Sequence, residues 1–219
     1  MGEKWTEYRL KELGKIISGD TPNTKKKEYF GGSIPWITPK DLSDHKERYV
    51  QYGERMITEK GFASCATHKI PPLSILFSSR APIGRMAITK GEVCTSQGFK
   101  AIVPNETVDY LFLYYLLKYY RDKIITMGSG STFREITTDV LSNISVRIPK
   151  KREEQERIGR ILDSLDSKIE LDYRINDNFY FRLDCFDIEI PTIEAEKSII
   201  LSYKLLFTKR NSRMNAVIL

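Results

Sequence analysis

The densest set of groups that could do chemistry is a run of carboxylates at Glu153, Glu154 and Glu156. A nuclease that uses divalent metal ions needs clustered carboxylates of this kind, with a lysine close to them. Here the glutamates are flanked by Arg152 and Arg157 in a segment with helical periodicity, where residues three or four apart pair on one face. We therefore interpret the run as a solvated, ion-paired helix face and not as a metal site.

Other sequence patterns that carry catalysis do not occur in the chain. There is no Gly-x-x-x-x-Gly-Lys-Ser/Thr phosphate loop, no Gly-x-Ser-x-Gly nucleophile turn and no His-Glu-x-x-His zinc motif. The Gly-Ser-Gly-Ser stretch at 128–131 resembles a phosphate-binding turn but lacks the lysine. Three separated cysteines and two histidines give neither a disulfide framework nor a zinc-ligand spacing. The sequence therefore predicts no catalytic site, no metal and no cofactor.

The charge balance of the chain is basic. Its 35 lysines and arginines against 29 acidic residues give a net charge of +6 and an isoelectric point near 9.1. Such a balance favours an acidic partner, with nucleic acid first, although solubility alone is an equally good reason for it. The positions of the charges must decide between these two interpretations.

Many of the basic and polar side chains fall in or beside predicted turns, where they would be accessible to DNA. The candidates for neutralising phosphates are Lys25, Lys26, Lys27, Lys40, Arg48, Arg80, Arg85, Lys100 and Arg134. The candidates for reading base edges are Ser78, Ser79, Gln97, Ser129, Thr132 and Arg134. Taken singly, each is more often a solvated surface residue than a DNA contact.

Short strands and one helix must position these side chains. Apolar runs and alternation predict strands at 5–10, 33–38, 73–79, 84–89, 99–103 and 144–148, and the proline of 33–38 suggests an edge strand or a strand start. A helix is predicted over 108–125, capped by Thr107 or Asp109, with its aromatic residues, Tyr119 among them, on one core-facing side. Trp36 and Phe99 are also interpreted as core residues.

A second, longer helix is predicted from Arg152 to about Leu183, a stretch without proline. Its apolar residues follow an a/d/e heptad pattern that the polar Asp172 interrupts. The residues assigned to helix pairing are Ile158, Ile161, Leu162, Leu165, Ile169, Ile175 and Phe179. At 1.5 Å per residue the helix would be about 48 Å long, too long to bury on one domain of this size, so it should pair with another helix.

These patterns divide the chain into three segments: an α+β, mixed-sheet domain at 1–150, the long coiled-coil-forming helix at 151–183, and a tail at 184–219 without a clear pattern. The first residues lack the apolar segment of a signal peptide, and no apolar run approaches the roughly 20 residues of a membrane helix. We expect a cytoplasmic protein that does not contact a membrane.

Five motifs, in order along about 180 residues, resemble the specificity subunit of type I restriction-modification systems. They are Gly19–Pro22 with Tyr29–Ile37, Leu76–Gly84, Ser96–Lys100, Gly130–Ile136, and Ile148–Pro149 with Glu153–Gln155. The helix over 154–178 resembles that family's spacer helix, and nothing beyond Leu183 resembles the family.

The resemblance implies a DNA-binding subunit that directs methylation and cleavage without an active site of its own. In the family, each recognition domain reads one half of a split target in double-stranded DNA. The spacer helices set the gap and bind modification subunits, which carry the methyltransferase site, while a separate restriction subunit cleaves DNA.

The chain departs from the family in one respect, since a full specificity subunit resembles two copies of this pattern in tandem. One recognition domain and one helix indicate either a half-subunit that pairs with another copy or a shortened, inactive fragment. A homodimer would specify a symmetric split target, because both copies would use the same surface. A standalone DNA endonuclease is the other alternative, for which the sequence lacks the carboxylate–lysine motifs.

Overall fold

A computed structural model describes residues 5–43, 47–128 and 135–184, with side chains of the last helix described as far as residue 176. The chain divides into two compact units, residues 1–171 and 172–219. The tail from residue 185 onward lies outside the described residues. None of the described helices is long and apolar enough to cross a membrane.

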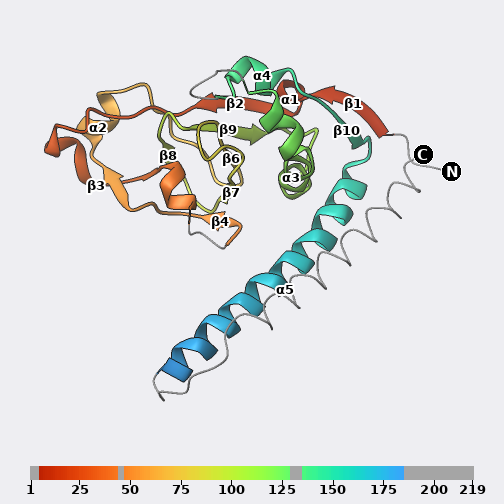
Figure 1. The fold of residues 1–219 in the computed structure, drawn as a ribbon. Helices are drawn as coiled ribbons and strands as arrows, with labels where there is room; N and C mark the ends of the chain where they lie inside the picture. The colour runs from red at the N-terminus through yellow and green to blue at the C-terminus, as the bar shows by residue number, and fades with distance from the viewer. Residues whose placement is uncertain (1–4, 44–46, 129–134, 185–219) are drawn as a thin grey trace. The chain divides into compact units, whose positions relative to one another are not determined.

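The first unit is organised around a five-stranded sheet in the order β2-β9-β6-β7-β4 (Figure 1). Its strands are β2 (Gly14–Ser18), β4 (Tyr49–Val50), β6 (Ile75–Ser78), β7 (Met86–Thr89) and β9 (Phe99–Pro104). All neighbours are antiparallel except β4 and β7, which pair in parallel. The predicted strands at 73–79, 84–89 and 99–103 are therefore confirmed.

Both faces of this sheet are buried. Successive side chains of a strand point to opposite sides, and they enter two different cores. In β6, Ile75 and Phe77 join the core beneath helix α3 (Tyr110–Thr126), whereas Leu76 joins a second core on the other face. Asp109 caps α3 by accepting a hydrogen bond from the backbone N–H of Phe112 at 2.8 Å. The predicted helix is confirmed, but Tyr119 is 73% exposed, so its assignment to the core-facing side was wrong. The helix presents Leu113 and Leu117 to the sheet instead.

A three-stranded sheet in the order β5-β3-β8 forms one end of the unit. It consists of β3 (Phe30–Ile37), β5 (Arg55–Ile57) and β8 (Cys94–Thr95), with α2 (Glu59–Ala63) and the 3-10 turns η1 (Lys27–Tyr29) and η2 (Pro39–Leu42) beside it. β3 lies between two neighbours, so the edge position that its proline suggested is wrong. The parallel partner β8 pairs only with Trp36 and Ile37, after Pro35, and the missing N–H of the proline is therefore tolerated. Trp36 and Phe99 are buried, as predicted.

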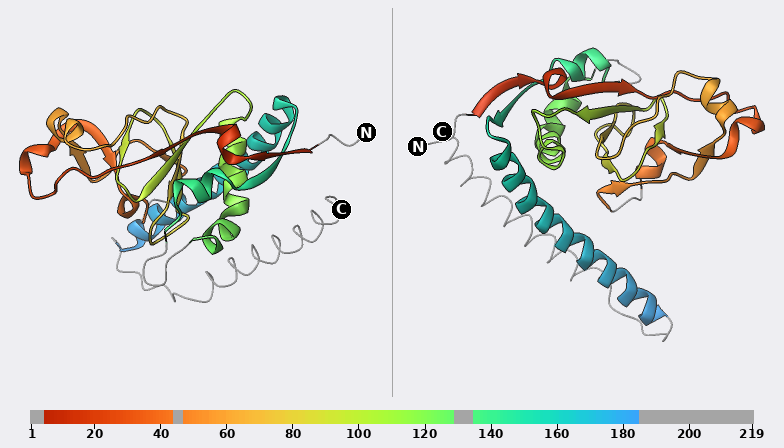
Figure 2. Two further views of the ribbon diagram at one scale, coloured as in Figure 1. Left: turned by 90° about the horizontal axis from the view of Figure 1, so that it is seen from above. Right: turned by 180° about the vertical axis from the view of Figure 1, so that it is seen from behind.

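The remaining elements join the start of the unit to the long helix. β1 (Trp5–Arg9) leads through α1 (Leu10–Leu13) into β2 and pairs antiparallel with β10 (Ser145–Pro149), which follows α4 (Thr138–Ser142). Figure 2 shows β1 lying beside β10. Helix α5 (Arg152–Asp184) begins three residues after β10 and agrees with the predicted helix. The fold is thus α+β with mixed sheets, as predicted.

The beginning of α5 is anchored in the unit by Gln155, whose side chain is fully buried. Its Oε1 accepts a hydrogen bond from the backbone N–H of Asp109 at 2.9 Å, and its Nε2 donates to the carbonyls of Thr107 and Pro149 at 3.2 and 2.8 Å. One turn later Gly159 faces α3, where an added Cβ would lie 3.0 Å from the backbone nitrogen of Phe112. The first turns of α5 therefore lie directly against the start of α3.

Replacing this glutamine with an apolar residue should destabilise the unit. In Gln155→Leu the N–H of Asp109 and two carbonyls lose their buried partners, so we expect the free energy of unfolding to fall by about 3 kcal/mol. Urea denaturation would measure the change, with the exposed Glu153→Gln as control, for which we expect a change within about 0.5 kcal/mol. Equal stability of the two variants would contradict this assignment.

Candidate nucleic-acid interface

The predicted basic turn Lys25, Lys26 and Lys27 is exposed and structurally defined. Asn23 accepts hydrogen bonds from the backbone N–H groups of Lys25 and Lys26, both at 3.1 Å. The Lys26 ammonium donates to the hydroxyl of Tyr29 at 3.1 Å, and this hydrogen bond raises the pKa of Lys26 above its ordinary value. Among the residues that the structure describes, no acidic side chain pairs with Lys25 or Lys27. The turn therefore presents positive charge to solvent.

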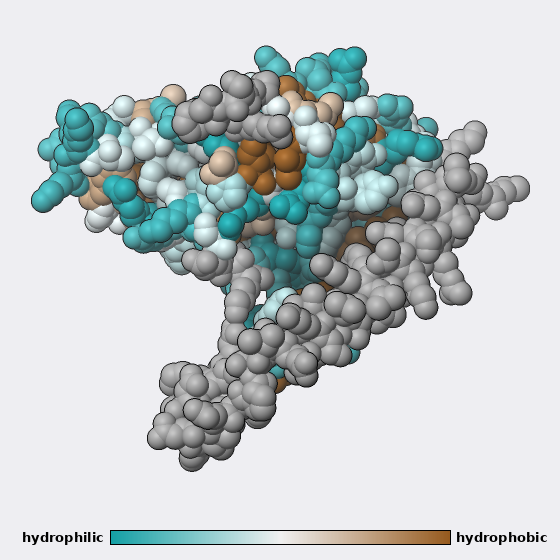
Figure 3. Space-filling model, in the orientation of Figure 1, coloured by the Kyte–Doolittle hydropathy of each residue, from teal (hydrophilic) through white to brown (hydrophobic). Residues whose placement is uncertain are grey.

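The segment that follows the turn is held by Thr58, at the junction of β5 and α2. Thr58 donates its backbone N–H to the carbonyl of Tyr29 at 3.0 Å and its hydroxyl to the carbonyl of Glu28 at 2.8 Å. Hydrophilic side chains project from this end of the unit beside a smaller apolar area, at the left of Figure 3. The lysines are thus carried on a fixed backbone.

Arg55, which the sequence analysis did not single out, lies on the same end sheet. Its guanidinium carbon is 4.0 Å from the ring centroid of Phe30 and 5.9 Å from that of Trp36. The side chain is exposed, and within the described part of the chain no carboxylate pairs with it. A guanidinium held over aromatic rings keeps its N–H fork free for a planar acceptor. The arrangement depends on the pairing of Trp36 with Arg55 across β3 and β5, a register that the residues alone do not reveal.

Four of the predicted contact residues turn inward and shape the fold. Ser78 and Ser79 are fully buried, and their hydroxyls donate to the carbonyls of Pro82 and Gly98 at 2.7 and 3.2 Å. Lys100 is also buried, with its ammonium 3.7 Å from Glu135. The half-buried Arg85 donates to the carbonyl of Leu42 at 2.7 Å. We leave these four out of the proposed surface, because their polar groups already have partners inside the unit.

Three of the remaining predicted residues are exposed, namely Gln97, Arg80 and Lys40. Arg80 donates to Glu135 at 3.0 Å and Lys40 to Glu54 at 2.9 Å, so each carries a partly neutralised charge. Ser129, Thr132 and Arg134 lie outside the described residues.

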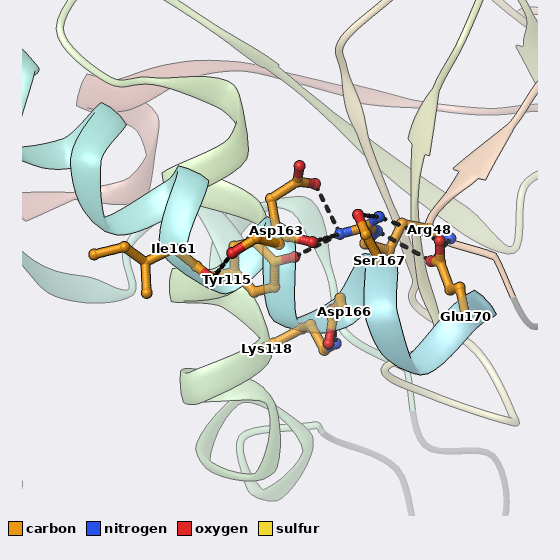
Figure 4. Close-up of polar contacts among 9 residues, drawn as sticks. Arg48, Tyr115, Lys118, Ile161, Asp163, Asp166, Ser167 and Glu170 are labelled. Atoms are coloured by element: carbon orange, nitrogen blue, oxygen red, sulfur yellow. Dashed lines mark hydrogen bonds and ion pairs between the residues drawn. The ribbon is translucent and has the colours of Figure 1, made fainter. Parts of the chain in front are cut away.

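Arg48, also a candidate for contacting phosphate, is instead buried between the unit's core and α5, with 7% of its surface exposed (Figure 4). One terminal nitrogen donates to the carbonyl and carboxylate of Asp163, both at 2.7 Å, and to the hydroxyl of Tyr115 at 3.1 Å. The other donates to Ser167 at 2.7 Å and to Glu170 at 3.2 Å. Its Nε lies 3.0 Å from Glu170 without the angle of a hydrogen bond. Arg48 thus connects α3 with two turns of α5.

Two opposing effects act on the protonation of Arg48. Burial disfavours the charged form, but the hydrogen bond with Tyr115 and the carboxylates of Glu170 and Asp163 outweigh it, so the pKa of Arg48 is raised. Burial also disfavours the charged form of Tyr115, which for a phenol raises the pKa of the hydroxyl. The contact is therefore a charged arginine against a neutral phenol and two carboxylates.

The residues of α5 divide into two faces up to Leu171. A polar face with the spacing 4, 4, 3 and 4 meets the unit, comprising Gln155, Gly159, Asp163, Asp166 and Glu170. Asp166 accepts from Lys118 of α3 at 3.0 Å. Of the residues assigned to helix pairing, Ile158 and Leu162 pack against the core, whereas Ile161, Leu165 and Ile169 are exposed. These three define the apolar stripe.

The last assigned residues fall in the second unit. Ile175 is 55% exposed, and the side chain of Phe179 lies outside the described residues.

The side chains that the sequence analysis considered for catalysis or metal binding do not form such a site in the described part of the chain. Arg152 contacts Glu156 at 3.3 Å and Arg157 pairs with Glu154, so two of the three glutamates of the run are ion-paired, as predicted for this helix face. The described residues contain no group of histidine, cysteine and acidic side chains that could hold a metal ion. Burial raises the pKa of the Cys94 thiol to about 11, which keeps it protonated at neutral pH.

Comparisons with known proteins agree on one family. The profile of the type I restriction modification DNA specificity domain matches residues 2–178. The MjaIX specificity subunit of Methanocaldococcus jannaschii is 42% identical over 172 residues, which are 76% of this chain and 39% of that protein. The chain therefore spans about two fifths of the length of this curated relative.

Solved structures show the same fold at lower identity. A chain from a type I restriction-modification system has a TM-score of 0.65 at 24% identity, over 85% of this chain and 44% of that one. The HsdS subunit of Thermoanaerobacter tengcongensis has a TM-score of 0.61 at 22% identity, over 80% and 40%.

A charge introduced at Leu162, which packs against the core, should affect stability differently from a charge at Leu165 on the exposed apolar stripe. Leu162→Glu places a carboxylate against the core, so we expect a loss of about 3 kcal/mol or more in the free energy of unfolding. Leu165→Glu, one turn away on the apolar stripe, should change it by less than about 0.5 kcal/mol. Urea denaturation at low protein concentration compares them, and a large loss in Leu165→Glu would show that the stripe is part of the core.

Proposed function

Because the chain belongs to the family of type I restriction modification DNA specificity domains, we propose that residues 1–171 read one half of a split DNA target. The observation that carries the proposal is the group of cations at one end of the unit. Lys25, Lys27 and Arg55 are exposed, lack acidic partners within the described residues and stand on a hydrogen-bonded framework. Anionic phosphate and the acceptor edge of guanine are the groups that such cations recognise in DNA.

The proposed surface separates two tasks. The lysines of the basic turn contact phosphates, together with Lys40 and Arg80 at its margin, and supply affinity that depends on salt. Arg55, held over two aromatic rings, and Gln97 offer donors in fixed positions for base edges. Ser129, Thr132 and Arg134, which the sequence predicts as further DNA contacts, are proposed to contribute as well.

The proposed partners follow from the apolar stripe of α5. It pairs with the equivalent helix of a second copy, and the pair binds the modification subunits, with a restriction subunit joining the complex. The alternative of a shortened, inactive fragment keeps the same DNA-reading unit but loses this assembly. A homodimer is favoured because the polar face of α5 is already occupied, which leaves the stripe for another helix.

We assign no catalytic role to the chain. A standalone endonuclease would need a carboxylate cluster that is free to hold a metal ion. Of the glutamates that come nearest to one, Glu156 and Glu154 are held in ion pairs with Arg152 and Arg157. The purified chain is therefore expected neither to cut nor to methylate DNA by itself.

DNA binding should weaken steeply as salt increases. Lys27→Ala should lower affinity equally for all sequences and reduce the slope of log affinity against log salt by about one unit, because one phosphate contact is lost. The exposed Lys151→Ala, at the start of α5, is the matched control and should leave the slope unchanged. Fluorescence anisotropy with random duplexes gives both values, and a flat salt response of the unaltered chain would refute the proposal.

Arg55→Ala should act differently from the lysine variants. We expect it to relax preference at a single base position, at a cost of about 1–3 kcal/mol for the preferred base, while the salt slope changes little. Selection of bound duplexes from a random library measures this preference. An unchanged selected sequence would remove Arg55 from the base-reading set.

Assembly should depend on the apolar stripe. The double variant Leu165→Glu/Ile169→Glu should remain folded but sediment as a monomer and fail to bind a modification subunit, because two charges would be buried in the helix pair. Analytical ultracentrifugation, with the exposed Lys168→Glu as control, measures the effect. Normal assembly of the double variant would show that α5 is not the assembly element.

A further inference from the structure

We propose that Arg48 is a positioning residue that locks the DNA-reading unit onto α5 and so fixes the gap between the two half-sites. The inference rests on the proposed function, since a gap exists only where two units read one target. Arg48 itself does not touch DNA, because its guanidinium is turned away from solvent into the junction (Figure 4). It acts through the angle at which the unit sits on the helix.

The geometry of Arg48 suits it to resist rotation. Its planar fork contacts Asp163, Ser167 and Glu170, which follow one another at spacings of four and three and therefore share one side of α5. Its backbone N–H also donates to Glu170, at 2.9 Å. Arg48 directly precedes β4, the edge strand of the five-stranded sheet, so its contacts connect the helix with that strand.

A second contact, made by Gln155, fixes the orientation of α5 together with Arg48. Gln155 holds the start of α5, and Glu170 lies fifteen residues further on, about 22 Å along the helix axis. One anchor alone lets a rigid helix swing about that point, whereas two anchors so far apart fix its direction and its rotation about its own axis. Lys118 also contacts Asp166 on this side, but the lysine side chain is 44% exposed, so this ion pair contributes little by comparison.

The consequence for DNA recognition follows from the size of the unit. A domain of about 150 residues has a radius of roughly 20 Å, so its far end lies roughly 40 Å from an anchor at its edge. A swing of about 5° then displaces that end by about 3.5 Å, close to the rise of one base pair. A loosened junction therefore lets the reading surface reach neighbouring gap lengths, while the bases recognised within each half-site stay the same.

The lock can be measured without DNA as a distance between spin labels. The native cysteines are replaced, and labels are placed at Lys60→Cys in α2 and Lys168→Cys in α5. With the labelled chain diluted into an excess of unlabelled chain, so that only labels within one copy are measured, we expect a single narrow distance distribution in the otherwise unaltered chain and one at least twofold broader in Arg48→Met. The triple variant Arg48→Met/Asp163→Asn/Glu170→Gln removes the uncompensated buried charges and keeps the test valid if the single variant does not fold. The matched control Lys118→Met should match the parent. An equally narrow distribution in the triple variant would overturn the lock.

Selection from a duplex library with half-sites at variable gaps tests the link to DNA. The parent should recover one gap length, and the triple variant should recover at least two adjacent gap lengths with unchanged half-site bases. Arg48→Lys keeps one charged contact and should lie between them, which a general loss of stability would not produce. Broadened distances with a single recovered gap would refute the link between lock and gap. If the parent binds no DNA, the proposed function fails, and the label distances alone decide whether Arg48 locks the junction.

Discussion

The contact between Arg48 and helix α5 is the constraint on which the rest of the structure depends. A guanidinium buried in this way needs acceptors for its donors, and Tyr115, Asp163, Ser167 and Glu170 supply them to its two terminal nitrogens. This requirement places polar residues on one side of an otherwise amphipathic helix. Together with the buried Gln155, it joins the part of the helix up to Leu171 to the rest of the first unit.

The occupied polar face explains why an apolar stripe stays exposed beside it. Apolar side chains at helical spacing would ordinarily pack on the helix's own domain. Here the polar face packs on the domain together with Ile158 and Leu162, and the apolar residues Ile161, Leu165 and Ile169 stay exposed. The exposed cations lie on the end sheet, apart from this junction, so DNA reading and assembly use separate surfaces in the account proposed above.

Local patterns in the sequence were sufficient to predict most of the fold. Alternation and apolar runs predicted β1, β3, β6, β7, β9 and β10 but missed β2 and the short β4, β5 and β8, and helical periodicity predicted α3 and α5. The residues that were misplaced have partners far away in the chain. Arg48 lies 115 to 122 positions from its acceptors on α5, and a lone basic residue in a turn gives no sign of such a contact. The position of Arg55 over its aromatic neighbours depends on the register between β3 and β5. Ser78 and Ser79 are buried because the end of β6 lies inside the unit. One sequence signal for the contact with α5 was available. Between Gln155 and Glu170, polar residues recur every three or four positions beside the apolar heptad, which indicates a second, polar contact face.

Methylation mapping in cells that express this chain with a type I modification subunit tests the central claim most directly. Two copies paired through the same helix face must read inverted half-sites. A helix of about 48 Å, against about 34–36 Å per turn of DNA, separates these half-sites by more than one turn from centre to centre. The account predicts a methylated target made of two inverted half-sites with several unread base pairs between them. An asymmetric or uninterrupted methylated site, or no methylation at all, would contradict it.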